Sequence, residues 1–203
     1  STEDLAYTEA FAKRTAESGF SVVSGGAKGV DQAAMLAALE MKGDVVGVLA
    51  DGLLRATTSR QYRSHLAENN LLLITPFSPE AGFNAGNAMQ RNRYIYCLSD
   101  ASVVVHSGHP ETSKNGKGGG TWTGAMENLK KAWVPLWVKR STDTKSGNAA
   151  IVDAGAHWLP EQLTDLVVES LIREPEAHSA SITTDIFAPV ANAVDDEKLA
   201  NHA

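Results

Sequence analysis

Short apolar runs alternate with segments of helical periodicity along most of this sequence, and this alternation constrains the fold more than any other feature. Runs rich in Val, Leu and Ile predict β-strands at 19–24, 44–49, 71–75, 101–106 and 134–138. Periodicity and composition predict helices at 2–18, 31–41, 59–69, 87–98, 121–132 and 160–171. Strands separated by helices pair in parallel through right-handed crossovers. The sequence therefore predicts an α/β fold, a Rossmann-like doubly wound, mostly parallel sheet with helices on both faces.

The predicted strands end in glycine-rich or polar segments. These ends lie at 24–26, 50–52, 75–76 and 106–108. A doubly wound sheet binds its ligands beyond the carboxyl ends of its strands. We therefore expect the functional site at this edge.

Both ends of the sequence depart from the alternating pattern. A doubly wound domain normally leads with a strand, whereas the first predicted element here is the helix at 2–18, so we expect a strand upstream of Ser1. From Arg173 onward, Ala, Ser, Thr, Pro and acidic residues replace the apolar periodicity. We predict one domain over 1–172, followed by an acidic flexible tail or linker over 173–203.

The composition excludes several classes of protein. The longest apolar runs are only about five residues, which is too short to span a bilayer. No basic segment followed by an apolar one opens the chain as a secretory signal would. The single cysteine, Cys97, cannot form a disulfide framework and fits a reducing compartment. We expect a cytoplasmic protein.

The formal net charge of −6 is unevenly distributed. Residues 161–203 carry −7 and residues 1–160 carry +1, while 51–145 alone carry +5. An acidic total argues against a nucleic-acid partner. Because the excess of acidic residues lies at the C-terminal end, the rest of the chain remains compatible with a nucleic-acid partner.

The first candidate site is the turn that follows the strand at 19–24. Its residues Ser24, Gly25, Gly26, Lys28 and Gly29 combine a sharp backbone turn, a positive charge and the free N–H groups of a helix start, which attract anions. Neither the P-loop nor the dinucleotide fingerprint is fulfilled. The glycine spacing fits a tight turn capped by Asp31 equally well.

Two further segments could contact phosphate. Arg91, Asn92 and Arg93 offer two guanidinium groups, although on a helix they point about 200° apart, so a solvated helix face is the simpler interpretation. The second segment is a glycine-rich basic loop that runs into a helix. Its candidate residues are Lys117, Gly119, Gly120 and Thr121, where flexibility alone could also explain the glycines.

Other chemistries have weak support. His106 and His109 lack a carboxylate or thiol at ligand spacing, so we expect no metal site. The Gly-x-Ser-x-Gly pattern of a hydrolase nucleophile is absent from the sequence. We expect no cofactor.

Together these motifs resemble the DNA-processing protein A family (DprA, also called Smf). Segment 24–31 resembles the SG-x-A-[RK]-G-[IV]-D block of that family, and 91–95 resembles its RNR-x-I block. Segment 51–53 looks like its G-x-G-[LI] turn, and the loop at 119–121 lies where the family has S-G-[ST]. The resemblance covers roughly residues 5–140.

The resemblance implies an extended Rossmann fold that binds single-stranded DNA, dimerises and loads a RecA-like recombinase during transformation. It implies that a positively charged DNA pocket is lined by Ser24, Gly25, Gly26, Lys28, Arg91, Asn92 and Arg93. It also implies that the family's first strand lies upstream of Ser1. We expect a non-enzymatic protein of this type, serving DNA uptake or a mobile-element or defence function.

Two alternatives remain open. The same glycine turns could hold a phosphorylated signal molecule in a nucleotide sensor. The lysine-decarboxylase-like phosphoribohydrolases share the fold, but their catalytic glutamate falls three residues after the threonine of their glycine loop. Counting from Thr121 reaches Gly124, while Glu127 lies one helical turn further on. The general acid/base position is therefore empty, which disfavours hydrolysis.

Overall fold

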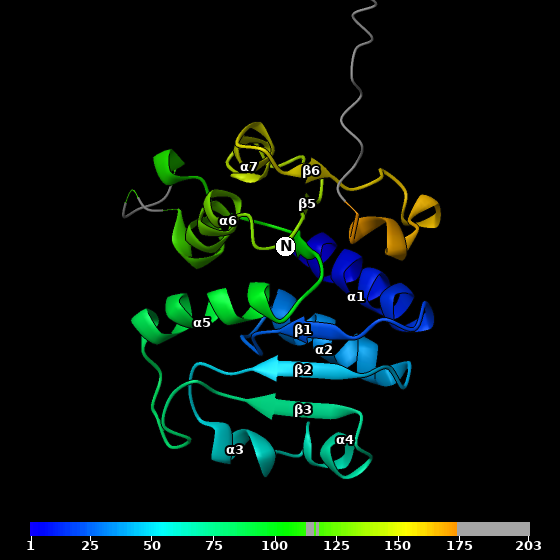
Figure 1. Cartoon of the computed structure of the whole chain (residues 1–203), viewed down its shortest axis with the longest axis vertical. Helices are drawn as coiled ribbons and strands as arrows, with labels where there is room; N and C mark the ends of the chain where they lie inside the picture. Colours follow the sequence, from blue (N-terminus) through cyan, green and yellow to red (C-terminus); the bar gives the residue numbers. More distant parts are fainter. Residues whose placement is uncertain (113–115, 117, 174–203) are drawn as a thin grey trace, which may run out of the picture.

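The computed structural model describes residues 1–112, 116 and 118–173 (Figure 1). In chain order its elements are α1 (Thr2–Glu17), β1 (Val22–Ser24), α2 (Val30–Glu40), β2 (Val45–Val48), α3 (Leu53–Thr57), α4 (Arg63–Ala67), β3 (Leu71–Ile74), α5 (Ala85–Cys97), β4 (Ser102–Val104), η1 (Pro110–Thr112), α6 (Gly119–Lys131), β5 (Leu136–Val138), α7 (Asn148–Asp153), β6 (His157–Trp158), η2 (Leu163–Asp165) and η3 (Val168–Leu171). The predicted tail at 173–203 lies outside the described residues, except for Arg173. Within the described part, every helix is too short or too polar to cross a lipid bilayer.

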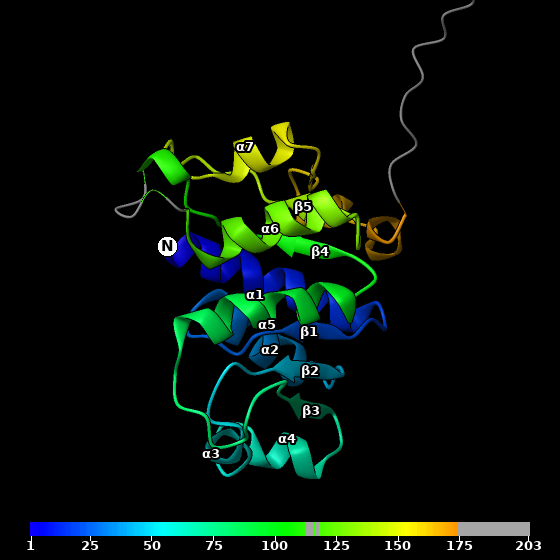
Figure 2. The same cartoon turned by 60° about the vertical axis from the view of Figure 1, so that its left-hand side comes forward.

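The strands form two parallel three-stranded sheets rather than the single sheet that the sequence predicts. Sheet A has the order β1-β2-β3 and sheet B the order β4-β5-β6. Figure 2 shows β1 at the edge of sheet A nearest sheet B, and β4 at the edge of sheet B nearest sheet A. The α/β class and the parallel arrangement are confirmed, with a break between β1 and β4.

Each sheet has its own apolar core. Helix α2 packs against β1, β2 and α1, which buries Met35, Leu39 and Val45. Helices α6 and α7 pack against β5 and bury Leu136 and Ile151. Helix α5 contacts both β2 and α6, so it joins the two halves (Figure 2).

Most predicted elements lie within a few residues of their observed bounds. The helix α3 was not predicted, however, the helix predicted at 59–69 is limited to α4, and the C-terminal prediction is wrong. The segment 160–171 is not one helix, because Leu166 and Val167 have extended backbone between η2 and η3. The Arg14 side chain of α1 takes the carbonyls that a helix would use, donating from Nε to Leu166 O at 2.9 Å and from Nη2 to Thr164 O at 3.2 Å. These long-range hydrogen bonds from Arg14 replace the backbone hydrogen bonds of the predicted helix.

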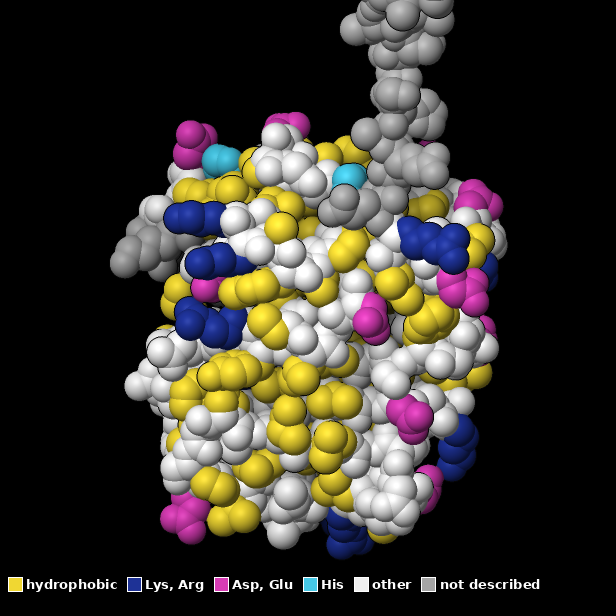
Figure 3. Space-filling model, in the orientation of Figure 1, with side chains coloured by type: hydrophobic (Ala, Val, Ile, Leu, Met, Phe, Trp, Pro, Cys, Tyr) yellow, Lys and Arg dark blue, Asp and Glu magenta, His cyan; other side chains and the backbone are white. Residues whose placement is uncertain are grey.

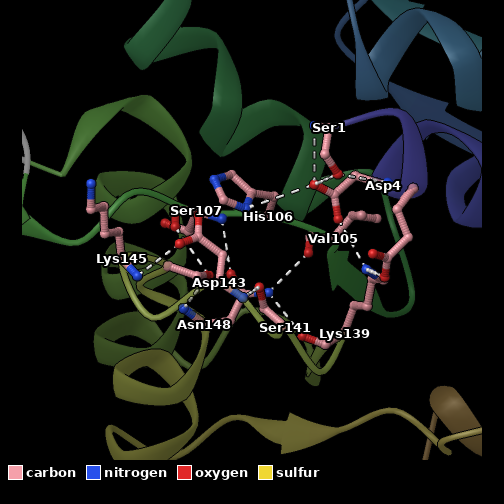
Figure 4. A network of polar contacts seen from close by, with 12 residues as sticks. Ser1, Asp4, Val105, His106, Ser107, Lys139, Ser141, Asp143, Lys145 and Asn148 are labelled. Carbon is pink, nitrogen blue, oxygen red and sulfur yellow. Dashed lines mark hydrogen bonds and ion pairs between the residues drawn. The ribbon is translucent and has the colours of Figure 1, made fainter.

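A network of polar contacts fixes the carboxyl end of sheet B (Figure 4). The Asn148 side chain at the start of α7 is fully buried and donates to Val105 O at 2.9 Å and Lys139 O at 2.8 Å, and it accepts from Ser107 N at 2.9 Å. Lys139 Nζ in turn lies 3.0 Å from Asp4 Oδ1. The ends of β4 and β5 are therefore tied to α7 and to the first turn of α1.

Replacing Asn148 with alanine should lower the free energy of unfolding by about 3 kcal/mol, because two carbonyls and one N–H would stay buried without partners. Urea denaturation followed by far-UV circular dichroism measures this. Asn87→Ala is the control, since the Asn87 side chain makes no hydrogen bond within the described residues, and it should change stability by less than about 0.5 kcal/mol. Equal effects of the two substitutions would contradict the proposed tie.

Candidate functional site

The turn between β1 and α2 is buried at its start and exposed at its end. Ser24 and Gly25 are buried, whereas Lys28 and Gly29 are exposed. Gly29 precedes α2 with φ of 104°, a left-handed conformation that side chains other than that of glycine rarely adopt. The turn thus presents Lys28 and the first N–H groups of α2 to the carboxyl edge of sheet A, as the sequence predicts.

A buried ion pair lies beneath this turn. The Arg91 side chain of α5 is 5% exposed; its Nη1 donates to Val48 O at the end of β2 over 3.0 Å and lies 3.7 Å from Asp31 Oδ2. Arg91 Nε is buried without a hydrogen-bond partner in the described part of the chain. Burial lowers the pKa of the guanidinium, although Asp31 and Asp51 raise it, and arginine remains charged. Arg91 therefore joins α5, β2 and α2 in one contact.

Asp31 already occupies the place predicted for an anion. Burial raises the pKa of its carboxyl above the usual value, while Arg91 and the backbone N–H groups of Ala27 and Gly25 act in the opposite direction. The Asp31 carboxylate thus neutralises Arg91 and accepts from the turn. Asp31 therefore lies against the turn as a counter-charge to Arg91, and the binding of an external anion at the turn stays a prediction.

The second and third candidate segments meet each other. Asn92 Nδ2 on α5 donates to Gly120 O in the first turn of α6 at 3.2 Å. Arg93 points elsewhere: its side chain is exposed, and Nη2 lies 3.3 Å from Glu127 Oε1 on α6. The two arginines diverge as their spacing on a helix requires. Only Arg91 faces the turn at 24–31.

A cavity of about 1510 Å³ opens between the two sheets and collects most of the predicted residues. Eight of them line it: Ser24, Lys28, Gly29, Arg91, Asn92, Gly119, Gly120 and Thr121. Gly25 lies beneath Arg91, Gly26 is half-buried in the same turn, and Lys117 falls outside the described residues. Figure 3 shows Lys and Arg side chains gathered on the left flank, beside α6 and α5.

Sequence reasoning missed the acidic groups of this cavity. Asp31 was expected only as a cap, yet it is the partner of Arg91. Asp4 and His106 also line the cavity, with His106 Nδ1 at 3.9 Å from Asp4 Oδ2 (Figure 4). No local signal joins residues so far apart in the sequence. Among the described ion pairs none involves Lys28, which leaves it as the uncompensated cation of the turn.

Comparison with protein families and curated relatives gives one consistent result. Residues 1–170 match the family described as DNA recombination-mediator protein A. A DNA processing protein DprA of Mycobacterium tuberculosis is 35% identical over 94 residues, which are 46% of this chain and 24% of the relative. DprA of Bacillus subtilis is 32% identical over 95 residues, which are 46% of this chain and 32% of the relative. The matched segment thus spans about a quarter to a third of these relatives.

Two solved structures share the fold. DNA processing protein A from Helicobacter pylori, described with a single-stranded DNA binding mode, superposes with a TM-score of 0.61 and 23% identity over 78% of this chain and 69% of that one. DprA from Streptococcus pneumoniae gives a TM-score of 0.62 and 19% identity, over 78% of this chain and 54% of that one. At these identities the likeness shows the fold alone.

Gly25→Ala should destabilise the protein by about 1–3 kcal/mol, because a Cβ at this position would overlap the Arg91 guanidinium and displace it. Urea unfolding measures the loss. Gly82→Ala is the matched control, since a Cβ there meets no atom within 4 Å. If Gly25→Ala and Gly82→Ala unfold at the same urea concentration, the position of Arg91 does not require a glycine at position 25.

Proposed function

Because this chain belongs to the DNA recombination-mediator protein A family, we propose that it binds single-stranded DNA at the carboxyl edge of its sheets and does so without catalysis. The observation that carries the proposal is the convergence of three separate segments on one cavity: the turn at 24–31, Arg91 with Asn92, and the start of α6. The Helicobacter pylori protein, which shares the fold, is described by its single-stranded DNA binding.

The chemistry of the cavity suits a phosphate backbone. Lys28 supplies a positive charge at the start of α2, where the N–H groups and the helix dipole favour an anion. Gly119 and Gly120 allow a backbone or ligand to approach α6 closely. Because Asp31 neutralises Arg91, we infer that Lys28 dominates the attraction and that Arg91 mainly holds the turn in shape.

We further propose that the protein acts as a homodimer in the cytoplasm and delivers DNA to a RecA-like recombinase, in DNA uptake or in a mobile-element or defence setting. Individual hydrophobic side chains are exposed and available for contacts with a second copy, among them Leu72, Phe83 and Leu98. Sedimentation analysis of the free protein tests the dimer.

The phosphoribohydrolase alternative gains no support from the described residues. Gly124, at the position of the expected glutamate, is buried in α6 against Tyr96 and Asn92. Glu127 is engaged with Arg93 at 3.3 Å. Release of ribose 5-phosphate from nucleoside monophosphates would overturn the non-enzymatic proposal. Tight binding of a mononucleotide without DNA affinity would favour a sensor.

Lys28→Glu should weaken binding of labelled single-stranded oligonucleotide by about tenfold or more, since a charge-assisted phosphate contact is lost. Fluorescence anisotropy across a salt series should also show a slope reduced by about 0.7 per lost contact. Lys42→Glu is the matched control, because it changes the net charge equally at an exposed site paired with Glu68. Equal weakening by both substitutions would show that only the net charge of the protein matters, and would contradict DNA binding at the turn that holds Lys28.

Acidification should strengthen DNA binding at constant ionic strength. As pH falls toward the raised pKa of Asp31, its carboxyl becomes neutral, repels phosphate less and leaves Arg91 uncompensated. Anisotropy titrations between about pH 8 and about pH 5 measure this effect. Asp31→Asn should bind more tightly at neutral pH and show a smaller pH dependence. An unchanged pH profile in that variant would exclude Asp31 as the titrating group.

A further inference from the structure

Phe83 is the most exposed large hydrophobic side chain in the part of the chain that the structure describes, with 76% of its surface accessible to solvent. It lies in the loop between β3 and α5 and belongs to none of the apolar clusters that form the described cores. An aromatic ring that stays in water forgoes the stabilisation that burial would give. Its large apolar surface is therefore available to a ligand.

The loop that carries Phe83 is anchored on both sides of this residue. Gly52 N donates to Ala81 O at 2.8 Å, which ties the loop to the start of α3. Directly after Phe83, the side chain of Asn84 caps α5 by accepting a hydrogen bond from Gly86 N at 2.7 Å. Figure 1 shows the loop beside α3 at the left of sheet A, where the strands of that sheet end. The backbone thus holds the ring at the carboxyl edge of the sheet.

Phe83 lines the same cavity as the candidate phosphate contacts. Lys28, which is exposed, and Gly120 at the start of α6 also line this cavity. A second exposed apolar side chain, that of Met89, lies against the start of α6, since a Cβ at Gly120 would be 4.0 Å from Met89 Cγ. The cavity is therefore bordered by apolar side chains as well as by a cation.

An aromatic ring and a cation on one cavity suit an unpaired nucleic-acid strand. The phosphates of such a strand are attracted to the cation, and its bases stack on aromatic side chains. In a duplex each base lies between neighbouring base pairs, and a protein side chain reaches its face only when the base is flipped out. Phe83 therefore has a partner in single-stranded DNA that intact double-stranded DNA does not offer.

We propose that Phe83 stacks on a base of single-stranded DNA whose phosphate backbone is bound at Lys28, and that this contact makes the site prefer single strands to duplexes. The inference rests on the proposed DNA-binding function and adds to it the residue that distinguishes the two forms of DNA. Because every base has an aromatic face, the contact favours unpaired bases without selecting a sequence.

Phe83→Ala should weaken binding of a labelled single-stranded oligonucleotide by about 5- to 150-fold, the range expected for the loss of one stacked base. Binding of a blunt duplex of the same sequence should stay unchanged. Phe83→Trp should retain single-strand binding, because an indole ring also stacks. Met41→Ala is the matched control, since it removes another exposed apolar side chain at the opposite end of α2 from the turn, and it should change neither affinity.

A fluorescent purine analogue within the oligonucleotide reports stacking directly, because its emission is quenched when the base stacks on an aromatic ring. Binding to the wild-type protein and to Met41→Ala should quench this emission. Phe83→Ala, at a concentration that saturates the oligonucleotide, should quench it less. A side chain that only shapes the loop would alter affinity without this loss of quenching.

The outcomes separate this proposal from the function on which it rests. If the wild-type protein binds no single-stranded DNA, both are wrong. If it binds, but Phe83→Ala retains its affinity and quenching, or loses duplex affinity by the same factor, the DNA site stands and the role of Phe83 is wrong. Loss of a dimer in Phe83→Ala on sedimentation, with unchanged DNA affinity, would instead assign the ring to a contact between copies of the chain.

Discussion

The buried contact between Arg91 and Asp31 is the interaction on which the site depends. It joins three elements that are distant in sequence: Asp31 belongs to the start of α2, Arg91 to α5, and Val48, whose carbonyl Arg91 also contacts, to the end of β2. A buried guanidinium is tolerable only when charge and hydrogen bonds compensate it. Removing the Arg91 side chain would take away its contacts with β2 and α2 at once, so the position of α5 relative to the turn and the sheet edge depends on this guanidinium.

This compensation changes how the charge of the chain is understood. Counting basic residues in the region 51–145 suggests a strongly attractive surface, at +5. In the folded protein Arg91 is paired with Asp31 and Arg93 with Glu127, so neither contributes a full free charge. The electrostatic attraction of the turn is concentrated at Lys28 and at the helix start beside it. For the proposed binding of a phosphate backbone, the placement of unpaired cations therefore matters more than the number of basic residues.

The sequence predicted those features that depend on local pattern. Apolar runs located five of the six strands, and glycines with positive φ, such as Gly29, marked the turn. The helices α3 and α7 and the two-residue strand β6 were missed because segments of two to six residues carry no measurable periodicity. The helix predicted at 160–171 failed because Arg14, about 150 residues away, takes its carbonyls. The Asp31–Arg91 pair likewise depends on packing that only the fold supplies.

The location of the candidate site follows from the order of the strands. From the break outward, β1, β2 and β3 follow one another in chain order on one side, and β4, β5 and β6 do so on the other. In doubly wound sheets the strand order reverses at such a point. The connections on either side then lead away from each other and leave a crevice at the carboxyl edge. Here the turn after β1 and the start of α6 border that crevice. The same strand order therefore accounts for both the gap between the two sheets and the position of the candidate site.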